Sequence, residues 1–503
     1  MEIPSHPILS CEAAGAFESR YFQGDEAREW PAMVRAGKAV AAAVRRDFRE
    51  MGEFPDAARI LVLAGKGHNA GDALIAAREL LAISSKARVD VEFAFGERTL
   101  RPLAQRAWRE LVEAAPGRVC AAGTAPGASY TLCLDGVFGF RFRPPIEPRI
   151  AALFERVNAL PIRLRAAVDV PSGGLFRADF TYATGIVKTA ALDPKTAGRL
   201  RYLDLGFFAE DGAAAPPAAS DRVLVPALLA PLAALRPAQS DKRTFGHVGI
   251  IGGSRSYPGA VLMAALAAVR SGAGLVTAFV PESLAAVFVA RAPEVMWVGW
   301  PETPDGGLAL EGRHLLDALR GRLTALVIGP GLGREAETHA LAKDIVAQSA
   351  VPLVIDADAL QPDIVSAGHV ARVLTPHAGE WARIGEASLM EATVVVKGPV
   401  TRIESRAGLQ SALRGAEGGL KPRPTAYYSL AGGPVLARGG SGDLLAGLIG
   451  GLLAQTPDDP LLAAARGALW HGLAADALAR ARGQVAVNTT QVLDFLGVAL
   501  REV

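Results

Sequence analysis

Residues 439–455 read GGSGDLLAGLIGGLLAQ, in which glycines and a serine precede one carboxylate, Asp443, and an apolar stretch follows. The apolar stretch predicts a helix that begins at this carboxylate. Unpaired N–H groups give a helix N-terminus a partial positive charge, and glycines let such amides approach an anion closely. GGSG can therefore hold a phosphate. Asp443 is then either a helix cap worth about 1 kcal/mol or a general base for a hydroxyl that attacks the phosphate.

Short segments rich in Val, Ile and Leu alternate with Ala-rich segments, which is the pattern of parallel sheets covered by helices on both faces. We therefore predict an α/β protein with two three-layer α/β/α domains. Nearly every predicted strand ends in Gly, Asp, Ser or Thr, and ligands bind at the carboxyl ends of parallel strands. The predicted strands lie within 59–67, 89–95, 130–139, 165–173, 247–254, 275–282, 325–333, 352–360, 372–380 and 392–400.

The chain has 503 residues, more than one hydrophobic core usually contains, which predicts two domains. An Ala- and Pro-rich stretch without periodicity separates them, so we expect domains at 1–212 and 239–503 and a linker at 213–238. Lys and Arg number 53 against 51 Asp and Glu, which gives no electrostatic reason to expect nucleic-acid or membrane partners. Three scattered cysteines and an N-terminus unlike a signal peptide favour a cytoplasmic protein.

Five motifs precede GGSGD in the second half of the chain. Together with it they resemble the ribokinase-like superfamily, and more closely its branch of ADP- or ATP-dependent NAD(P)H-hydrate dehydratases, over residues 236–503. The resemblance implies a ribokinase-like domain in the second half. The motifs are HVGIIGGSRSYPGAVLMAALAAVRSGAG (247–274), LVIGPGLGR (326–334), VIDADAL (354–360), LTPHAGEWARI (374–384) and VVVKGPVTRI (394–403).

A second set of motifs, in the first half, resembles the Rossmann-like NAD(P)H-hydrate epimerase domain up to about residue 210. Since the two domains occur fused in this order, the whole chain is similar to a bifunctional nicotinamide-nucleotide repair enzyme. Such an enzyme interconverts the R and S epimers of hydrated NAD(P)H and dehydrates the S epimer at the expense of ADP or ATP. The motifs are VLAGKGHNAGDALIAAREL (62–80), LDGVFGFRFRPP (134–145), VDVPSGG (168–174) and FTYATGIVKTA (180–190).

In the dehydratase half, the resemblance implies that Asp443 takes the proton of the hydroxyl group on C6 of the hydrated nicotinamide ring. The backbone of the glycine turn would stabilise the moving phosphoryl group, and Mg²⁺ would accompany ADP or ATP. Asp356 could support the metal through water. His377 is either a substrate contact or a structural histidine, and Lys397 either a phosphate contact or a surface lysine. The implied substrate residues are Ala260, Gly333 and His377, and the implied nucleotide residues are Lys397, Gly398, Pro399, Val400, Thr401, Gly440, Ser441 and Gly442.

In the epimerase half, the resemblance implies a potassium ion at Asn69, Asp135 and Ser172, whose oxygen groups suit a hard cation. Asp169 would be the acid–base residue that helps the C6 hydroxyl leave and return. The other interpretation is that Asp135 and Asp169 only cap loops at strand ends. The implied substrate residues are His68, Asn69, Ala70, Gly71, Asp72, Gly139, Phe140, Arg141, Phe142, Arg143, Pro144 and Pro145.

Several features depart from the family pattern. Ala70 and Ala73 replace usual glycines, and their Cβ atoms are expected to narrow the approach of a phosphate and weaken epimerisation. An irregular stretch around 405–428 is expected to be an exposed insertion. The alternative function is a ribokinase-like small-molecule kinase with a non-catalytic N-terminal ligand-binding module. Family precedent implies a homo-oligomer. The preferences for ADP or ATP, and for hydrated NADH or NADPH, are left open.

Overall fold

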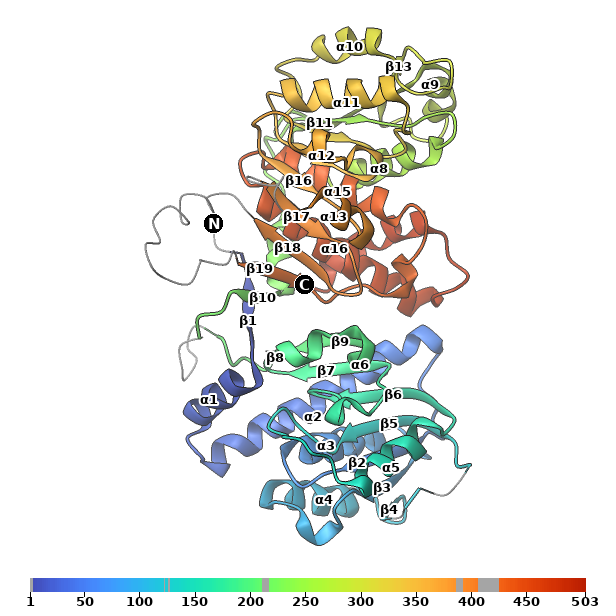
Figure 1. The fold of residues 1–503 in the computed structure, drawn as a ribbon. Coiled ribbons are helices and arrows are strands. Elements are labelled where there is room, and N and C mark those ends of the chain that lie inside the picture. Colours follow the sequence, from blue (N-terminus) through green and yellow to red (C-terminus); the bar gives the residue numbers. More distant parts are fainter. Residues whose placement is uncertain (1–2, 122, 125–126, 210–216, 386–391, 406–424) are drawn as a thin grey trace. The chain divides into compact units, whose positions relative to one another are not determined.

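The computed structural model describes residues 3–121, 123–124, 127–209, 217–385, 392–405 and 425–503 (Figure 1). It divides into an N-terminal unit, His6–Val223 with Ala479–Gly483, and a C-terminal unit, Met1–Ser5, Leu224–Leu478 and Gln484–Val503. The domain limits 1–212, 213–238 and 239–503 stay predictions, although strand β10 (Asp221–Leu224) and helix α7 (Ala230–Ala233) lie inside the expected linker. Most of the expected insertion, 406–424, lies outside the described residues.

A parallel sheet forms the centre of the N-terminal unit. Its order, within the described residues, is β4-β3-β2-β5-β6-β7-β9, and every neighbouring pair is parallel (Figure 1). The strands are β2 (Arg59–Ala64), β3 (Arg88–Phe93), β4 (Val119–Ala121), β5 (Tyr130–Gly136), β6 (Ile162–Val168), β7 (Phe180–Thr184) and β9 (Arg199–Leu203). Outside this sheet, β1 (Ser5–Leu9) pairs in parallel with β8 (Val187–Lys188).

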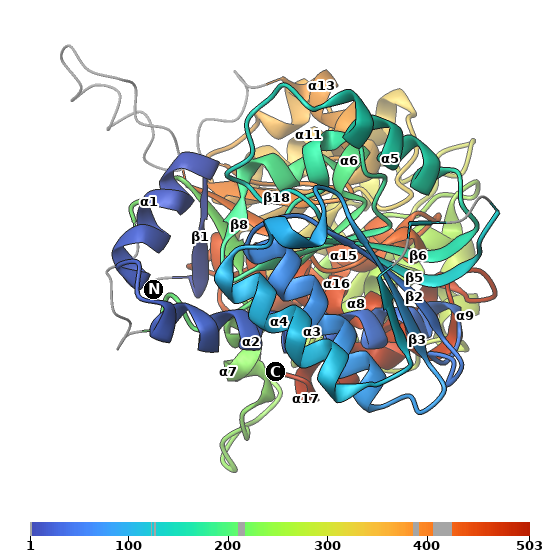
Figure 2. The ribbon, with the colours of Figure 1, turned by 90° about the horizontal axis from the view of Figure 1, so that it is seen from below.

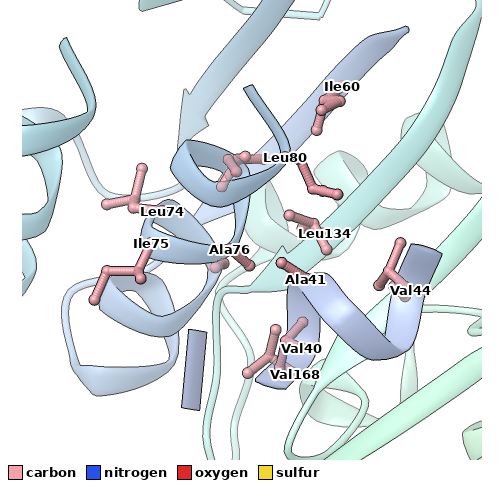
Figure 3. Close-up of a cluster of buried hydrophobic side chains, with 14 of the residues drawn as sticks. Val40, Ala41, Val44, Ile60, Leu74, Ile75, Ala76, Leu80, Leu134 and Val168 are labelled. Carbon is pink, nitrogen blue, oxygen red and sulfur yellow. The ribbon is translucent and has the colours of Figure 1, made fainter. Parts of the chain in front are cut away.

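Helices cover both faces of this sheet. Successive side chains of each buried strand point to opposite faces, so both faces are apolar and both need to be covered. Ile60 and Val62 point to the face covered by α2 (Glu26–Phe48), α3 (His68–Ala82) and α4 (Pro102–Ala114). Leu61 and Leu63 point to the face covered by α5 (Pro148–Asn158). Figure 2 shows α3 and α4 side by side, and Figure 3 shows the packing of α2 and α3 against the strands. The unit also contains α1 (Cys11–Phe22) and α6 (Pro194–Ala197).

The C-terminal unit contains a second sheet, in which the described strands follow the order β13-β12-β11-β14-β15-β16-β17-β18-β19. Pairs from β13 to β17 are parallel, whereas β17–β18 and β18–β19 are antiparallel. The strands are β11 (His247–Ile251), β12 (Leu275–Pro281), β13 (Met296–Trp300), β14 (Ala325–Ile328), β15 (Leu353–Ile355), β16 (Arg372–Leu374), β17 (Ala392–Val396), β18 (Thr401–Ser405) and β19 (Ala426–Ser429).

Helices also cover both faces of the second sheet. α8 (Pro258–Arg270) and α15 (Ser441–Gln455) pack together on β11 and β14. α10 (Arg313–Asp317), α11 (Ala336–Gln348), α12 (Pro362–Val365) and α13 (Ala378–Ile384) contribute to the core on the other face. The predicted α/β class with two three-layer units is thus confirmed. The remaining helices are α9 (Glu282–Val289), α16 (Pro460–Arg482) and α17 (Leu496–Arg501).

Glycines explain how the helix of the opening motif lies so close to its neighbours. A Cβ at Gly447 would lie 2.0 Å from the carbonyl oxygen of Ala264 in α8, and one at Gly450 would lie 2.1 Å from Val327 Cγ2 in β14. Only glycine fits at such approaches. The motif therefore both shapes the helix N-terminus and sets the packing of α15.

The described part of the chain contains no helix with the length and apolarity required to span a membrane.

We expect Leu74→Ala to lower the free energy of unfolding of the N-terminal unit by about 2–5 kcal/mol, because Leu74 is fully buried and its loss leaves a cavity under α3 (Figure 3). Hydrogen exchange of peptides from β2 and α3 in increasing urea measures the change. Leu74→Met keeps the volume and should cost less than about 1.5 kcal/mol. Equal losses in the two variants would contradict the cavity explanation.

Candidate functional site

The GGSGD segment forms a sharp turn into α15. Gly440 has φ +88°, a conformation that favours glycine, and a Cβ there would lie 2.4 Å from Met263 Cε, so that the methionine side chain would have to move. Ser441 Oγ donates to the carbonyl oxygen of Leu436 at 2.7 Å. Thr489 Oγ1 donates to the carbonyl oxygen of Gly439 at 3.0 Å. These bonds fix the turn that precedes the first amides of α15.

Neighbouring strand ends bring an ion pair to this turn. Asp356 follows β15, Thr375 follows β16 and Lys397 follows β17. Lys397 Nζ donates to Asp356 Oδ1 at 2.9 Å, and Thr375 Oγ1 donates to the same oxygen at 2.7 Å. The side chain of Lys397 is 22% exposed and that of Asp356 is 2% exposed. Lys397 is therefore part of a largely buried pair and not a surface lysine.

The charges of Asp356 and Lys397 both affect the pKa of Asp443. Burial raises the pKa of Asp443 most, the charge of Asp356 adds to the rise and Lys397 opposes it, so that the pKa is about 6. Burial works against the charge on Lys397, but Asp356 and Asp443 outweigh it and raise the pKa of the lysine. A Cβ on Gly442 would lie 3.0 Å from Lys397 Nζ, so the ammonium lies close to the backbone of the turn. Asp443 can thus act as a base near neutral pH.

The other residues expected in this half lie on several loops. His377 is the N-cap of α13: its Nδ1 accepts from Gly379 N at 3.0 Å, while the rest of the side chain is exposed. Gly333 has φ +83° and donates to Asp358 Oδ2 at 3.1 Å. Ala260, in the first turn of α8, lies near the Gly-rich loop after β14. The remaining predicted residues, Gly398, Pro399, Val400 and Thr401, form the connection from β17 into β18.

A cavity of about 390 Å³ lies in the N-terminal unit. The predicted residues on its wall are His68, Asn69, Asp72, Gly139, Phe140, Arg141, Phe142 and Asp169. The expected substrate residues that do not line it are Ala70, Gly71, Arg143, Pro144 and Pro145.

The two substitutions in the glycine loop point away from this cavity. Ala70 and Ala73 are fully buried and belong to the core beneath α3. Gly71 does not line the cavity either, and a Cβ there would lie 2.4 Å from Met33 Sδ of α2. The expectation that the Cβ atoms of Ala70 and Ala73 narrow the approach of a ligand is therefore wrong. The reason is that α3 begins at His68, so these residues already follow helical geometry.

Asp169 forms a buried ion pair at the carboxyl end of β6. Its Oδ1 lies 2.5 Å from Lys188 Nζ, and the two side chains are 3% and 1% exposed. Asp169 has φ +68°, a conformation uncommon for a residue other than glycine, and its N–H donates to the carbonyl oxygen of Tyr182 at 2.8 Å. The surrounding sheet thus holds this carboxylate in one orientation.

The charged residues of the cavity that the sequence analysis did not name include Lys188 and Glu18. Lys188 stands within the quoted FTYATGIVKTA, where a single lysine in an apolar strand was the available signal. Glu18 lies in AFESRYF of α1, where no motif distinguishes it from a solvent-exposed glutamate. Both line the cavity with Asp169.

Asn69 and Ser172 both bond to the backbone of Phe138, and Ser172 also bonds to Asp135. Ser172 Oγ donates to Asp135 Oδ1 at 2.7 Å, and Asn69 Nδ2 donates to the carbonyl oxygens of Phe138 at 3.2 Å and Val168 at 2.9 Å. Burial raises the pKa of Asp135 to about 6. The described residues contain no group of three or more His, Cys, Asp or Glu side chains suited to a metal ion. The donors here are amide, hydroxyl and carboxylate oxygens, which fit an alkali cation better than a transition metal.

In comparisons with known proteins, the two halves of the chain match two different family models. The family model described as NAD(P)H-hydrate dehydratase matches residues 248–497, and the one described as YjeF-related protein N-terminus matches residues 31–194. The bifunctional NAD(P)H-hydrate repair enzyme Nnr of Moorella thermoacetica is 33% identical over 93% of this chain and 92% of its own length. The chain belongs to this family of bifunctional repair enzymes. The relative from Gloeobacter violaceus is 35% identical over 89% of each chain, and that of Escherichia coli is 31% identical over 92% of this chain and 88% of its own.

The family resemblance inferred from the motifs is thereby confirmed for both halves. The YjeF-related match covers the cavity residues from His68 to Lys188, and the dehydratase match covers the turn at Asp443 with the Lys397–Asp356 pair. The roles of the individual residues in the family reaction stay predictions.

We expect Gly139→Ala to lower the free energy of unfolding of the N-terminal unit by about 1–3 kcal/mol. Its Cβ would lie 2.7 Å from Asn69 Oδ1 and would force the amide away from the carbonyls of Phe138 and Val168. Gly67→Ala is the matched control, because no atom lies within 4 Å of its Cβ position. Hydrogen exchange of the α3 peptides in urea measures both. A control variant as unstable as Gly139→Ala would disprove the steric cause.

Proposed function

We propose that this chain repairs hydrated nicotinamide nucleotides in two steps. The N-terminal unit interconverts the R and S epimers of NAD(P)H hydrate. The C-terminal unit then dehydrates the S epimer at the expense of ADP or ATP. Membership of the bifunctional repair family supports both steps. The observation that carries the proposal is Asp443, partly buried at a glycine-lined helix N-terminus and electrostatically coupled to the Lys397–Asp356 pair.

The dehydratase step has to make hydroxide a better leaving group. Hydroxide leaves poorly near neutral pH, but a phosphorylated C6 oxygen leaves readily, driven by the lone pair of the ring nitrogen. Asp443 takes the proton of the C6 hydroxyl while the hydroxyl oxygen attacks the terminal phosphorus of the nucleotide. The terminal phosphoanhydride bond breaks at the same time and releases AMP from ADP, or ADP from ATP. The amides of Gly440, Ser441 and Gly442, together with Lys397, stabilise the charge on the moving phosphoryl group.

The carboxylates near the turn also suit the metal that accompanies the nucleotide. Asp356 is buried, and its Oδ1 already accepts bonds from Lys397 and Thr375, so Oδ2 is the atom that would hold Mg²⁺ through water. When bound, Mg²⁺ neutralises charge on the phosphates. Ala260, Gly333 and His377 would contact the hydrated substrate, and residues 397–401 would contact ADP or ATP.

The epimerase step needs an acid and a base at C6. Asp169 exchanges a proton with the C6 hydroxyl, and Lys188 holds its carboxylate in place. Asn69, Asp135 and Ser172 would hold a potassium ion, which when bound compensates the buried charge of Asp135. His68, Asp72 and residues 139–142 would contact the nucleotide. Homo-oligomer formation, a cytoplasmic location and the lack of nucleic-acid and membrane partners stay predictions.

We expect Asp443→Asn to lower the rate at which NADH is recovered from its hydrate by about 10²–10⁴-fold, because the substitution removes the base. The assay follows the near-ultraviolet absorbance of reduced nicotinamide, starting from mixed epimers with ADP and then ATP. Since Asp443 acts when ionised, the rate of the unmodified chain should rise as pH passes about 6. Full recovery by Asp443→Asn would contradict the mechanism, and a stable phosphorylated product would favour the small-molecule kinase instead.

Asp169→Asn tests the other half in the same assay. We expect this variant to retain fast recovery of the S epimer and to lose recovery of the R epimer, because only the epimerase step requires Asp169. Chromatographic separation of the two epimers during the reaction measures each one. Continued consumption of both epimers at the original rate would disprove the role of Asp169.

We expect potassium chloride to raise the melting temperature of the N-terminal unit relative to choline chloride at equal ionic strength, since a ligand that binds the folded state stabilises it. At about 100 times the dissociation constant the gain would be about 2.7 kcal/mol. Ser172→Ala removes one proposed ligand and should abolish the difference between the two salts. A difference that persists unchanged in this variant would exclude the proposed ion site.

A further inference from the structure

Glu18 reaches the epimerase cavity from a helix that the motifs do not include. Strand β1 pairs with β8 so that Leu9 lies opposite Lys188. Ser10 then caps α1, with its Oγ accepting from Ala13 N at 3.1 Å. The start of α1 is thus fixed beside Lys188. Two turns further on, Glu18 lines the cavity, as does a residue one turn beyond it, Phe22.

The carboxylate of Glu18 is enclosed but only weakly neutralised. Its side chain is 16% exposed, and Oε2 lies 3.4 Å from Arg141 Nη2. Lys188, which lowers the pKa of Glu18 more than Arg141 does, is itself paired with Asp169 at 2.5 Å. Burial raises the pKa of Glu18 to about 7; Lys188 and Arg141 lower it, whereas Asp169 and Glu29 raise it.

Burial and neighbouring charges raise the pKa of two carboxyl groups of the cavity, Glu18 and Asp72. Asp72 faces the cavity from α3, and burial together with the charges of Asp169 and Glu18 raises its pKa well above the ordinary value. Lys188 forms an ion pair with Asp169. The other titratable or charged groups of the wall are Glu29, Lys66, His68, Arg101 and Arg141. Glu18, with its raised pKa, therefore faces the same cavity as the Asp169–Lys188 pair.

We propose that Glu18 is the second acid–base residue of the epimerase cavity and acts opposite Asp169 on the hydrated nicotinamide ring. This proposal rests on the proposed function of the N-terminal unit. It assigns a catalytic role to a residue outside the family motifs. The geometry that carries it is the shared cavity, into which α1 and the end of β6 each supply one carboxyl group.

Glu18 and Asp169 together supply and accept the protons that epimerisation at C6 requires. Protonated Glu18 gives its proton to the C6 oxygen, the C6–O bond breaks, and the lone pair of the ring nitrogen forms a double bond to C6, releasing water. A water molecule then adds to C6 on the other face and gives its proton to Asp169. The epimeric alcohol results, with the proton moved from one carboxyl group to the other. The reverse direction uses the same pair with roles exchanged, so both directions require one proton on the pair.

The test uses the full chain and purified R epimer. We expect Glu18→Gln to slow epimerisation by about 10²–10⁴-fold, with KM changed by less than about threefold and ADP-dependent dehydration of the S epimer unchanged. In the unmodified chain the epimerisation rate should fall as pH rises through about 7, where Glu18 loses its proton. This fall should be missing from the residual rate of Glu18→Gln. Glu18→Asp keeps the carboxyl group and should restore part of the rate.

Glu12→Gln is the matched control, since Glu12 lies on the exposed side of the same helix and should leave the rate unchanged. Retention of the rate by Glu18→Gln, or a residual rate that still falls near pH 7, would overturn the assignment of Glu18 while leaving the proposed function intact. Absence of epimerisation from the unmodified chain would overturn the proposed function of the N-terminal unit, and the role of Glu18 with it.

Discussion

Each half of this protein depends on a buried lysine–aspartate ion pair at the carboxyl ends of a parallel sheet. Lys397 pairs with Asp356 in one unit, and Lys188 pairs with Asp169 in the other. Such pairs bring little net stability, because desolvation offsets their attraction, but breaking one by removing a single partner typically costs about 3–5 kcal/mol. The pairs therefore fix charge in position rather than hold the fold together. In each unit a second carboxyl group, Asp443 or Glu18, has its pKa raised under the influence of this pair.

The two pairs also explain why the sites use carboxyl groups as proton carriers near neutral pH. An isolated aspartate in water is ionised far below pH 7 and is a weak base. Burial raises the pKa of Asp443, the adjacent Asp356 adds to this, and Lys397 limits the rise to about 6. The result is a base whose pKa is close to the pH at which it must work. The same balance of burial and neighbouring charge acts on Glu18 in the cavity of the N-terminal unit.

Local sequence features predicted most strands of the C-terminal unit, and also drew attention to Asp356 after a buried strand and Asp443 at the start of a helix. Lys397 was named through the family resemblance. Residues placed by long-range packing could not be found so. Glu18 reaches the cavity through the pairing of β1 with β8, across nearly 180 residues, and no local pattern encodes that contact. The prediction that Ala70 faces a ligand was wrong, because the motif suggests a loop at a position where α3 has already begun.

The glycines of α15 make this helix a rigid support for the carboxylate at its end. With 1.5 Å of rise per residue, Gly450 lies about 10 Å along the axis from Asp443. Its missing side chain lets the helix rest directly on Val327 of β14. A methyl group added there would have to displace either Val327 or the helix, and a displaced helix would also move the turn that carries Asp443. Changes in turnover without changes at any ligand contact would thus reveal this mechanical coupling.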